Sequence, residues 1–326
     1  MAQPLTLSVW SDENVKVADV LAAMEGLRKP ERLPPFRTTV MTLVMLASRR
    51  SNADWAMSAV YELGGRHPAR TLLILTDPYG DTGVDAEVRL LGGRADGAEL
   101  WFEDIELTVR GDVTDHLDSL IEPFTVADLP VVSWFVDGLP AADDAMIRAS
   151  DVILVDARGF GDTDCFETIA SLLEERPVVD LSWVRLAPWR ALLAGLFDGR
   201  ELRPFLSGVR SVQVFGKTGP RHLLGGWLVD RLGLEHDVVE LHDALHVSIG
   251  IDAVAGGRTA RFEVVRAGDE RMVTARAHIS GGPESSSVVV LPDATPAWGL
   301  ADALSHLERD PVYEGALRVA LALPSA

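Results

Sequence analysis

The run Arg37-Thr-Thr-Val-Met-Thr-Leu-Val-Met-Leu-Ala47 decides the fold of the first half of the chain. It is short, β-branched and mostly apolar, which is typical of a strand covered on both faces. A helix is expected next, because Ser51 or Asn52 can cap it and Gly64-Gly65 can end it. A second buried-strand run follows at residues 71–75. This strand–helix–strand order predicts a βαβ unit, and therefore a parallel sheet covered by helices.

The rest of the first half extends this alternation and interrupts it once. Two strand-like runs, residues 86–91 and 99–109, flank the glycine-rich segment 92–97, which predicts an antiparallel hairpin. The first half is therefore expected to be α/β, with a mainly parallel sheet and a hairpin insertion. Its other expected elements are strands at 5–10, 129–136 and 151–156 and helices at 15–27, 112–121, 141–149 and 163–174.

The second half has a different pattern. After a strand at 208–215 and a helix at 222–232, residues 237–291 hold four or five strands with no helix between them. Consecutive strands predict an antiparallel sheet, so this half is expected to be α+β, closed by helices at 297–308 and 312–322. Pro177 ends the last helix of the first half, and we place the boundary there. The predicted domains are residues 1–177 and 178–326.

Composition limits the classes of function. The chain has 326 residues and a net charge of −19, which disfavours binding to nucleic acid or to an anionic membrane surface. The longest nearly uncharged apolar run, residues 38–48, is shorter than the about 20 residues that cross a bilayer. The first ten residues lack the features of a signal peptide. A single cysteine, Cys165, fits a reducing compartment, so a cytoplasmic protein is expected.

Two glycine motifs resemble phosphate-binding loops but are incomplete. Gly216-Lys217-Thr218 lies between a predicted strand and a helix, yet Ser211 stands where the full pattern needs glycine. The segment 159–164 lacks its third glycine, and Asp162 and Asp164 would place negative charge at the pyrophosphate position. Both segments are better explained as ordinary strand-to-helix turns, so we expect no cofactor.

Metal and thiol chemistry are also disfavoured. His242 and His246 have the spacing of a zinc-protease helix, but their flanks alternate at period two, which favours a strand or turn. Cys165 opens a predicted helix, and the neighbouring carboxylates favour its protonated form, so an inert thiol is expected. No nucleophile elbow is present, and no acid/base pair stands out among the carboxylates. We therefore predict no catalytic residues and no metal site.

Tryptophan and arginine gather in one short segment. Trp183, Arg185, Trp189 and Arg190 lie within eight residues, and Pro188 can hold them on one rigid turn. Trp and Arg dominate the energetic centres of protein interfaces, so this cluster is a candidate contact site. The alternative is that both tryptophans fill the core while the arginines pair with local carboxylates. Burial of both rings would favour that alternative.

The same segment carries a family resemblance. Asp180-Leu-Ser-Trp-Val-Arg-Leu-Ala-Pro-Trp-Arg-Ala-Leu-Leu193 is similar to the central motif of the OpcA family, the glucose-6-phosphate dehydrogenase assembly proteins. Leu223-Leu-Gly-Gly-Trp-Leu-Val-Asp-Arg-Leu-Gly233 resembles a helix of that family's second domain. Residues 37–44, 66–70, 130–134 and 151–160 resemble its first domain. The resemblance covers most of the chain in order, and the Arg- and Ala-rich composition resembles an actinobacterial member.

The resemblance implies a non-catalytic protein that binds glucose-6-phosphate dehydrogenase and promotes its active, oligomeric form in the oxidative pentose phosphate pathway. Such a protein acts as an allosteric activator. Photosynthetic relatives are regulated through thiols, but a chain with Cys165 alone cannot form an internal disulfide. The resemblance assigns no role to single residues. Our candidates for partner contact are Trp183, Arg185, Trp189 and Arg190, with Arg37, His67 and Arg70 as weaker ones.

A function of another class stays open. The βαβ half of the chain could bind a sugar phosphate or a nucleotide beyond its strand ends and act as an enzyme. The loops expected to hold such a ligand are residues 64–70 and 156–164.

Overall fold

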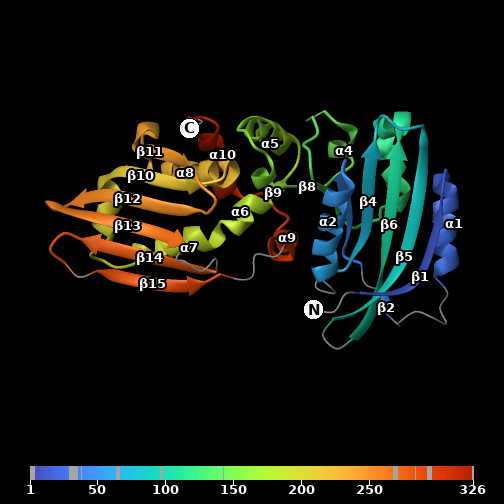
Figure 1. Cartoon of the computed structure of the whole chain (residues 1–326), viewed down its shortest axis with the longest axis horizontal. Coiled ribbons are helices and arrows are strands. Elements are labelled where there is room, and N and C mark those ends of the chain that lie inside the picture. The colour runs from blue at the N-terminus through green and yellow to red at the C-terminus, as the bar shows by residue number, and fades with distance from the viewer. Residues whose placement is uncertain are drawn as a thin grey trace. The chain divides into compact units, whose positions relative to one another are not determined.

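The computed structural model describes residues 4–28, 36–37, 39–63, 67–95, 98–141, 143–266, 271–282, 284–291 and 296–324. The chain forms two compact units (Figure 1). Unit 1 comprises Met1–Val155, Ser171–Val179 and Thr295–Glu308, and unit 2 comprises Asp156–Ala170, Asp180–Ala294 and Arg309–Ala326. Each unit combines three separate stretches of the chain. The division into the continuous domains 1–177 and 178–326 therefore stays a prediction.

Unit 1 is built on one mixed sheet. Its strands are β1 (Leu5–Asp12), β2 (Phe36–Arg37), β3 (Met41–Ala47), β4 (Ala69–Asp77), β5 (Gly83–Ala95), β6 (Ala98–Arg110), β7 (Val131–Phe135), β8 (Val152–Val155) and β9 (Val178–Asp180). They lie in the order β1-β5-β6-β4-β3-β7-β8-β9, with β2 beside β6. The pairs from β6 through β4, β3 and β7 to β8 are parallel, whereas β1–β5 and β5–β6 are antiparallel. The predicted α/β class with a hairpin insertion is confirmed.

The central strands are buried as their apolar sequences predict. Val44 and Met45 in β3 and Leu72, Leu73 and Ile74 in β4 have no exposed surface. Each such side chain contributes about 1.5–3 kcal/mol when it leaves water. Helix α2 (Arg50–Leu63) packs against β3 and β4, and α1 (Val17–Leu27) packs against β1 and β5 (Figure 1). The core of the sheet therefore forms where β3, from the apolar run 37–47, pairs with β4.

Two expected helices are shorter than predicted. The segment 112–121 forms the 3-10 turn η3 (Gly111–His116), the helix α3 (Leu117–Ile121) and the turn η4 (Glu122–Phe124). The Thr114 hydroxyl donates to Gly111 O at 2.8 Å, a local bond that competes with the α-helical pattern. Helix α4 spans only Ala145–Arg148, because Asp144 caps it by accepting the Met146 amide at 2.8 Å. The remaining elements that contribute to unit 1 include α9 (Pro296–Ser305), which packs against α2.

Unit 2 is built on an antiparallel sheet in the order β11-β10-β12-β13-β14-β15. Its strands are β10 (Val209–Gly216), β11 (Val239–Asp243), β12 (Ser248–Ala255), β13 (Arg258–Arg266), β14 (Met272–Ile279) and β15 (Ser285–Val290). Only the β10–β11 pair, which a helix connects, is parallel. The predicted α+β class and its run of five strands after that helix are confirmed.

Unit 2 also contains helices and short turns, and the last residues of one of these helices belong to unit 1. They are α6 (Leu181–Arg185), α7 (Ala187–Leu196), α8 (Thr218–Leu232) and α10 (Pro311–Ala320), with α5 (Asp164–Glu175) and the turns η5 (Ala157–Gly159), η6 (Arg203–Gly208) and η7 (His236–Val238). Helix α7 packs against β13 and β14, and α8 packs against β10, β11 and α10. A Cβ added at Gly226 in α8 would lie 2.9 Å from Ala320 N and closer still to Ala316 O. The two helices therefore touch backbone to backbone at this glycine.

Candidate functional site

The segment Asp180–Arg190 turns sharply after strand β9. Asp180 ends the strand and caps α6, because its Oδ1 accepts the Ser182 amide at 2.8 Å. Helix α7 follows after Leu186, and Pro188 lies in its first turn, where the missing N–H costs nothing. The turn thus brings the aromatic and basic side chains of two short helices into one cluster.

Trp183 and Arg190 form the centre of this cluster. The Trp183 side chain is buried, and its Nε1 donates to Asp310 Oδ2 at 2.7 Å. The Arg190 guanidinium lies 3.4 Å from the centre of the Trp183 ring and donates to Trp183 O at 2.7 Å. Burial lowers the pKa of Arg190 to about 10, and Asp310 offsets part of that effect. Ring, guanidinium and carboxylate therefore form one partly buried stack.

Asp180 is a fully buried carboxylate beside this stack. Its Oδ1 also accepts the Ala157 amide at 3.1 Å, and its Oδ2 accepts the Tyr313 hydroxyl at 3.2 Å. Burial raises the pKa of Asp180 to about 7, with a further contribution from the Asp156 carboxylate. These bonds connect α6 to the turn η5 and to helix α10, so the carboxylate joins three elements of unit 2.

Asp156 binds the polar edge of the cluster. Its Oδ1 accepts the Arg185 guanidinium at 2.5 Å and the Ser182 hydroxyl at 2.7 Å. The Arg158 amide donates to the same Ser182 hydroxyl at 2.7 Å. Arg185 therefore pairs with a local carboxylate, as the alternative interpretation of the sequence expected for the arginines.

The tryptophan cluster belongs to the core of unit 2. Trp183 and Trp189 expose 4% and 6% of their surfaces. Arg266 lies 5.4 Å from the centre of the Trp189 ring. Both rings thus act in packing within this chain, whereas Arg185 and Arg190 are partly exposed. Sequence reasoning missed Asp180, Tyr313 and Asp310, although the helix-cap pattern of Asp310 before Pro311 was visible.

The weaker candidates lie in unit 1. Arg70 is buried and pairs with Glu103 Oε2 at 2.7 Å, so it is an internal ion pair. His67 is half-buried, and its Nε2 lies 3.4 Å from Ser305 Oγ. Arg37 belongs to β2, but its side chain lies outside the described residues.

Comparison with known proteins covers both halves of the chain. The models of the N-terminal and C-terminal domains of a glucose-6-phosphate dehydrogenase subunit, the OpcA family, match residues 60–171 and 176–317. The chain belongs to this family. The cluster around Trp183 lies within the family's C-terminal domain, and Arg70 and His67 lie within its N-terminal domain.

Two curated relatives carry the same family name. An OxPP cycle protein OpcA of Synechocystis sp. is 22% identical over 233 residues, which cover 64% of this chain and 48% of that protein. An OxPP cycle protein OpcA of Nostoc punctiforme is 25% identical over 183 residues, which cover 52% of this chain and 39% of that protein. The chain therefore matches about half or less of the length of these OpcA relatives.

Solved structures of low similarity were also found. A levoglucosan dehydrogenase has a TM-score of 0.47 at 8% identity and covers 87% of this chain and 94% of its own. A protein described as an NADPH-dependent oxidoreductase of Desulfitobacterium hafniense has a TM-score of 0.43 at 12% identity and covers 86% and 92%. At these scores the likeness carries no functional conclusion for this OpcA-family chain.

The glycine motif at residues 216–218 is a strand-to-helix turn, as expected. Gly216 ends β10 and Thr218 begins α8, with Lys217 in the cap position. The Arg221 side chain is buried and donates to Gly216 O at 3.3 Å and to Asp243 Oδ1 at 3.0 Å. The start of the helix is thus tied to the end of β11.

Cys165 is buried, and the histidine pair lies in a strand and the turn after it. Burial raises the pKa of the Cys165 thiol to about 12, with further contributions from Asp180, Asp162 and Asp164. His242 lies in β11, and His246 follows that strand, so the pair does not share a helix. Among the described residues, no group of three or more His, Cys, Asp or Glu side chains is arranged to hold a metal ion.

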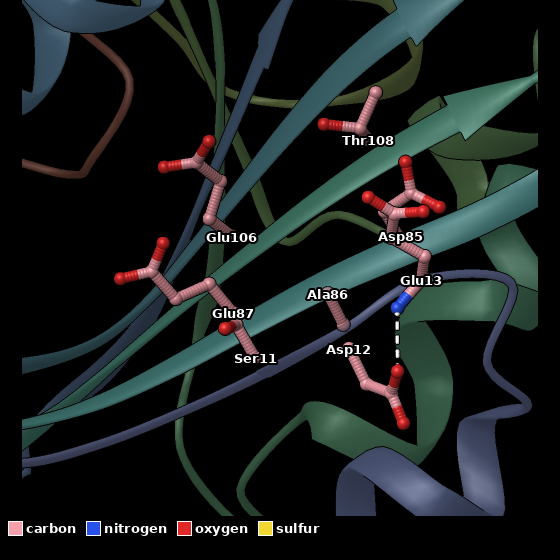
Figure 2. Close-up of a pocket in the computed structure, with 8 residues that line it drawn as sticks. All are labelled: Ser11, Asp12, Glu13, Asp85, Ala86, Glu87, Glu106 and Thr108. Atoms are coloured by element: carbon pink, nitrogen blue, oxygen red, sulfur yellow. Dashed lines mark hydrogen bonds between the residues drawn. The ribbon is translucent and has the colours of Figure 1, made fainter.

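One open depression lies on the sheet of unit 1 (Figure 2). Its volume is about 500 Å³, and its lining includes Asp12, Glu13, Asp85, Glu87 and Glu106. Glu87 and Glu106 face each other across β5 and β6, and Arg89 binds both, at 2.6 Å and 3.5 Å. Arg110 pairs with Asp85 and holds the pKa of that carboxyl below its usual value. Arginine neighbours thus neutralise much of this acidic surface.

Residues 67 and 68, from the loop 64–70 expected to hold a ligand, directly precede β4, which runs parallel to β3. They therefore lie at the amino end of the parallel strands. Ligands of open parallel sheets bind beyond the carboxyl ends. Residues 64–66 lie outside the described part of the chain. None of the described helices is long and apolar enough to span a bilayer.

Proposed function

We propose that the protein is a non-catalytic assembly factor and allosteric activator of glucose-6-phosphate dehydrogenase. It would favour the active oligomer of that enzyme and so support the oxidative pentose phosphate pathway in the cytoplasm. The observation that carries this proposal is that the domain models of the OpcA family match both halves of the chain. The names of the two curated relatives are consistent with it.

An activator of this kind acts by differential binding. It must bind the active state of the dehydrogenase more tightly than the inactive one, because equal affinity for both states shifts nothing. A coupling free energy of about 1–3 kcal/mol would change substrate affinity by about 5–150-fold. That range is within the reach of one protein interface with a few well-packed contacts.

The non-catalytic role rests on the state of the reactive groups in unit 2. The Cys165 thiol is buried with a raised pKa, so little of the nucleophilic thiolate forms at neutral pH. The buried carboxylate of Asp180 is hydrogen-bonded to Ala157, Ser182 and Tyr313. These groups stabilise the local fold, which supports a binding role rather than a chemical one.

We further propose that the segment Asp180–Arg190 supports the dehydrogenase contact. Trp183 and Trp189 would hold the segment rigid from within, and the partly exposed Arg185 and Arg190 would present their outer edges. Rigid presentation lowers the entropy lost on binding. In unit 1, His67 is more accessible than Arg70, which is buried.

The proposal is tested by mixing the purified chain with the glucose-6-phosphate dehydrogenase of the same organism. Light scattering after size-exclusion chromatography gives the mass of the mixture, and substrate saturation curves give KM and kcat. We expect the two proteins to co-migrate and the apparent KM for glucose 6-phosphate to fall about 5-fold or more. Separate migration together with unchanged kinetics would refute the proposal.

A variant pair tests the contact segment. Arg185→Ala removes one partly exposed guanidinium of the segment, whereas Arg200→Ala removes an exposed one after α7. We expect R185A to weaken activation and R200A to preserve it, with thermal unfolding showing that both chains remain folded. Equal activation by both variants and the parent would remove Arg185 from the contact while leaving the assembly role intact.

A further inference from the structure

The parallel strands of unit 1 have the arrangement of a dinucleotide-binding sheet. From β6 to β9 the order is β6-β4-β3-β7-β8-β9. After β3 the chain first adds β4 and β6 on one side of β3 and then adds β7, β8 and β9 on the other side, so the order reverses at β3. In open sheets of this order, a dinucleotide binds beyond the carboxyl ends at that switch point. Its pyrophosphate lies at the amino end of the helix after the first strand, which here is α2 after β3.

The residues at this switch point do not fit a pyrophosphate. The turn from β3 into α2 reads Ser48-Arg49-Arg50-Ser51-Asn52 and has none of the glycines that let a phosphate approach the backbone. The backbone N–H groups of Ser48 and Arg49 are already bonded to a carboxylate of the chain itself. That carboxylate is Asp137, from the segment that follows β7.

The geometry around Asp137 is that of a bound anion. Its carboxylate accepts the Ser48 amide at 2.9 Å, the Arg49 amide at 3.1 Å and the Asn52 Nδ2 amide at 3.0 Å. Three donors converge on one carboxylate at the positive end of α2, which favours negative charge there. The strands β3 and β7 that bring these groups together are direct neighbours.

We propose that Asp137 is a built-in anion that closes the dinucleotide site of this fold. A phosphate group and the Asp137 carboxylate would compete for the same N–H donors, and their like charges would repel. Asp77 ends β4, close to where such folds place the acid that binds the ribose. Asp137 thus closes the pyrophosphate half of the site, whereas the ribose half keeps its acid. It follows that the chain binds neither NAD(P)⁺ nor free phosphate at this position.

Substitution of Asp137 tests the proposal on the isolated chain, independently of any dehydrogenase. Asp137→Ser removes the internal carboxylate, and Asp143→Ser removes an exposed aspartate six positions further along the chain as a control. Thermal midpoints are measured against inorganic phosphate, NAD⁺ and NADP⁺ at constant ionic strength. We expect D137S alone to gain a phosphate-dependent rise of roughly 2 °C or more, while the parent and D143S stay unchanged.

Amide NMR of the parent chain keeps the test decisive if D137S fails to fold. We expect the Ser48 and Arg49 amide signals to stay fixed as NADP⁺ is added to millimolar concentration. Saturable shifts of these two signals would overturn the proposal, as would a folded D137S chain that does not respond to phosphate. Both results leave the dehydrogenase partnership untouched, because neither measurement involves the dehydrogenase.

Discussion

The guanidinium of Arg190 lies 3.4 Å from the centre of the Trp183 ring and donates to the carbonyl oxygen of the same residue at 2.7 Å. One side chain thus joins the start of α7 to helix α6. A partly desolvated cation over a tryptophan ring contributes about 2 kcal/mol, and a hydrogen bond from a charged donor about 1.5–3 kcal/mol. The contact is therefore a substantial part of the stability of unit 2.

We expect Arg190→Ala to lower the free energy of unfolding by about 2–4 kcal/mol. Arg190→Lys should lose less, because the ammonium keeps the charge but lacks the planar group that stacks on the ring. Urea unfolding followed by tryptophan fluorescence measures both. Arg200→Ala is the control, since Arg200 is exposed, and its change should stay within about 0.5 kcal/mol. Equal stability of R190A and the parent would show that the stack contributes nothing.

The buried carboxylate of Asp180 predicts a pH dependence of stability. Its pKa in the folded chain is raised to about 7 by burial and by Asp156, whereas an unfolded aspartate titrates at about 3.9. Between these values the folded chain binds the extra proton. Stability from this group is therefore complete below about pH 4 and is lost as the pH rises through 7.

Asp180→Asn isolates this contribution, because the amide imitates the neutral acid in shape and cannot ionise. We expect the parent chain to lose stability relative to D180N between pH 5 and pH 8, by an amount of a few kcal/mol. Denaturant midpoints at several pH values give the difference. Parallel pH profiles for the two chains would place the titration elsewhere.

The sheets could be predicted from sequence because their signals are local. The apolar run before Ala47 and the turns between the late strands specify period and burial without knowledge of any partner residue. Strand β9 has three residues, too few for a periodic pattern, and it was missed. The predicted helix at 112–121 is too regular, because the apolar spacing does not reveal that the Thr114 hydroxyl donates to Gly111 O.

The site was harder to predict because its contacts join distant residues. The sequence directed attention to Trp183, but its partner Asp310 lies 127 positions further along the chain. The anion role of Asp137 also needs two strands to pair before the donors converge. Residue types alone therefore suggested a surface, whereas burial places both tryptophans of the segment in the core.

The contact of α8 with α10 predicts opposite effects for two glycine substitutions. Gly226→Ala would push its methyl group into the backbone of α10 near Ala316 and Ala320, which cannot move without separating the helices. Gly195→Ala in α7 meets nothing within 4 Å. We expect G226A to destabilise the chain by about 1–3 kcal/mol and G195A to stabilise it by about 0.5–1 kcal/mol, measured by thermal unfolding. A stabilising G226A would contradict the close helix contact.

The reactivity of the Cys165 thiol reports on the integrity of unit 2, because the thiol reacts only when it is exposed. The side chain is buried at the start of α5, and its Sγ donates to Asp162 O at 3.3 Å. With a pKa of about 12, far less than one thiol in a thousand is ionised at pH 7.5.

We expect a disulfide reagent such as DTNB to label the native chain very slowly and the chain in guanidinium within seconds. D180N should label about as slowly as the parent, since burial is the main cause of the raised pKa, whereas G226A should label faster if loosening of α8 opens the unit. Rapid labelling of the native parent chain would show that the thiol is accessible. Redox regulation through an intermolecular disulfide would then be a candidate mechanism.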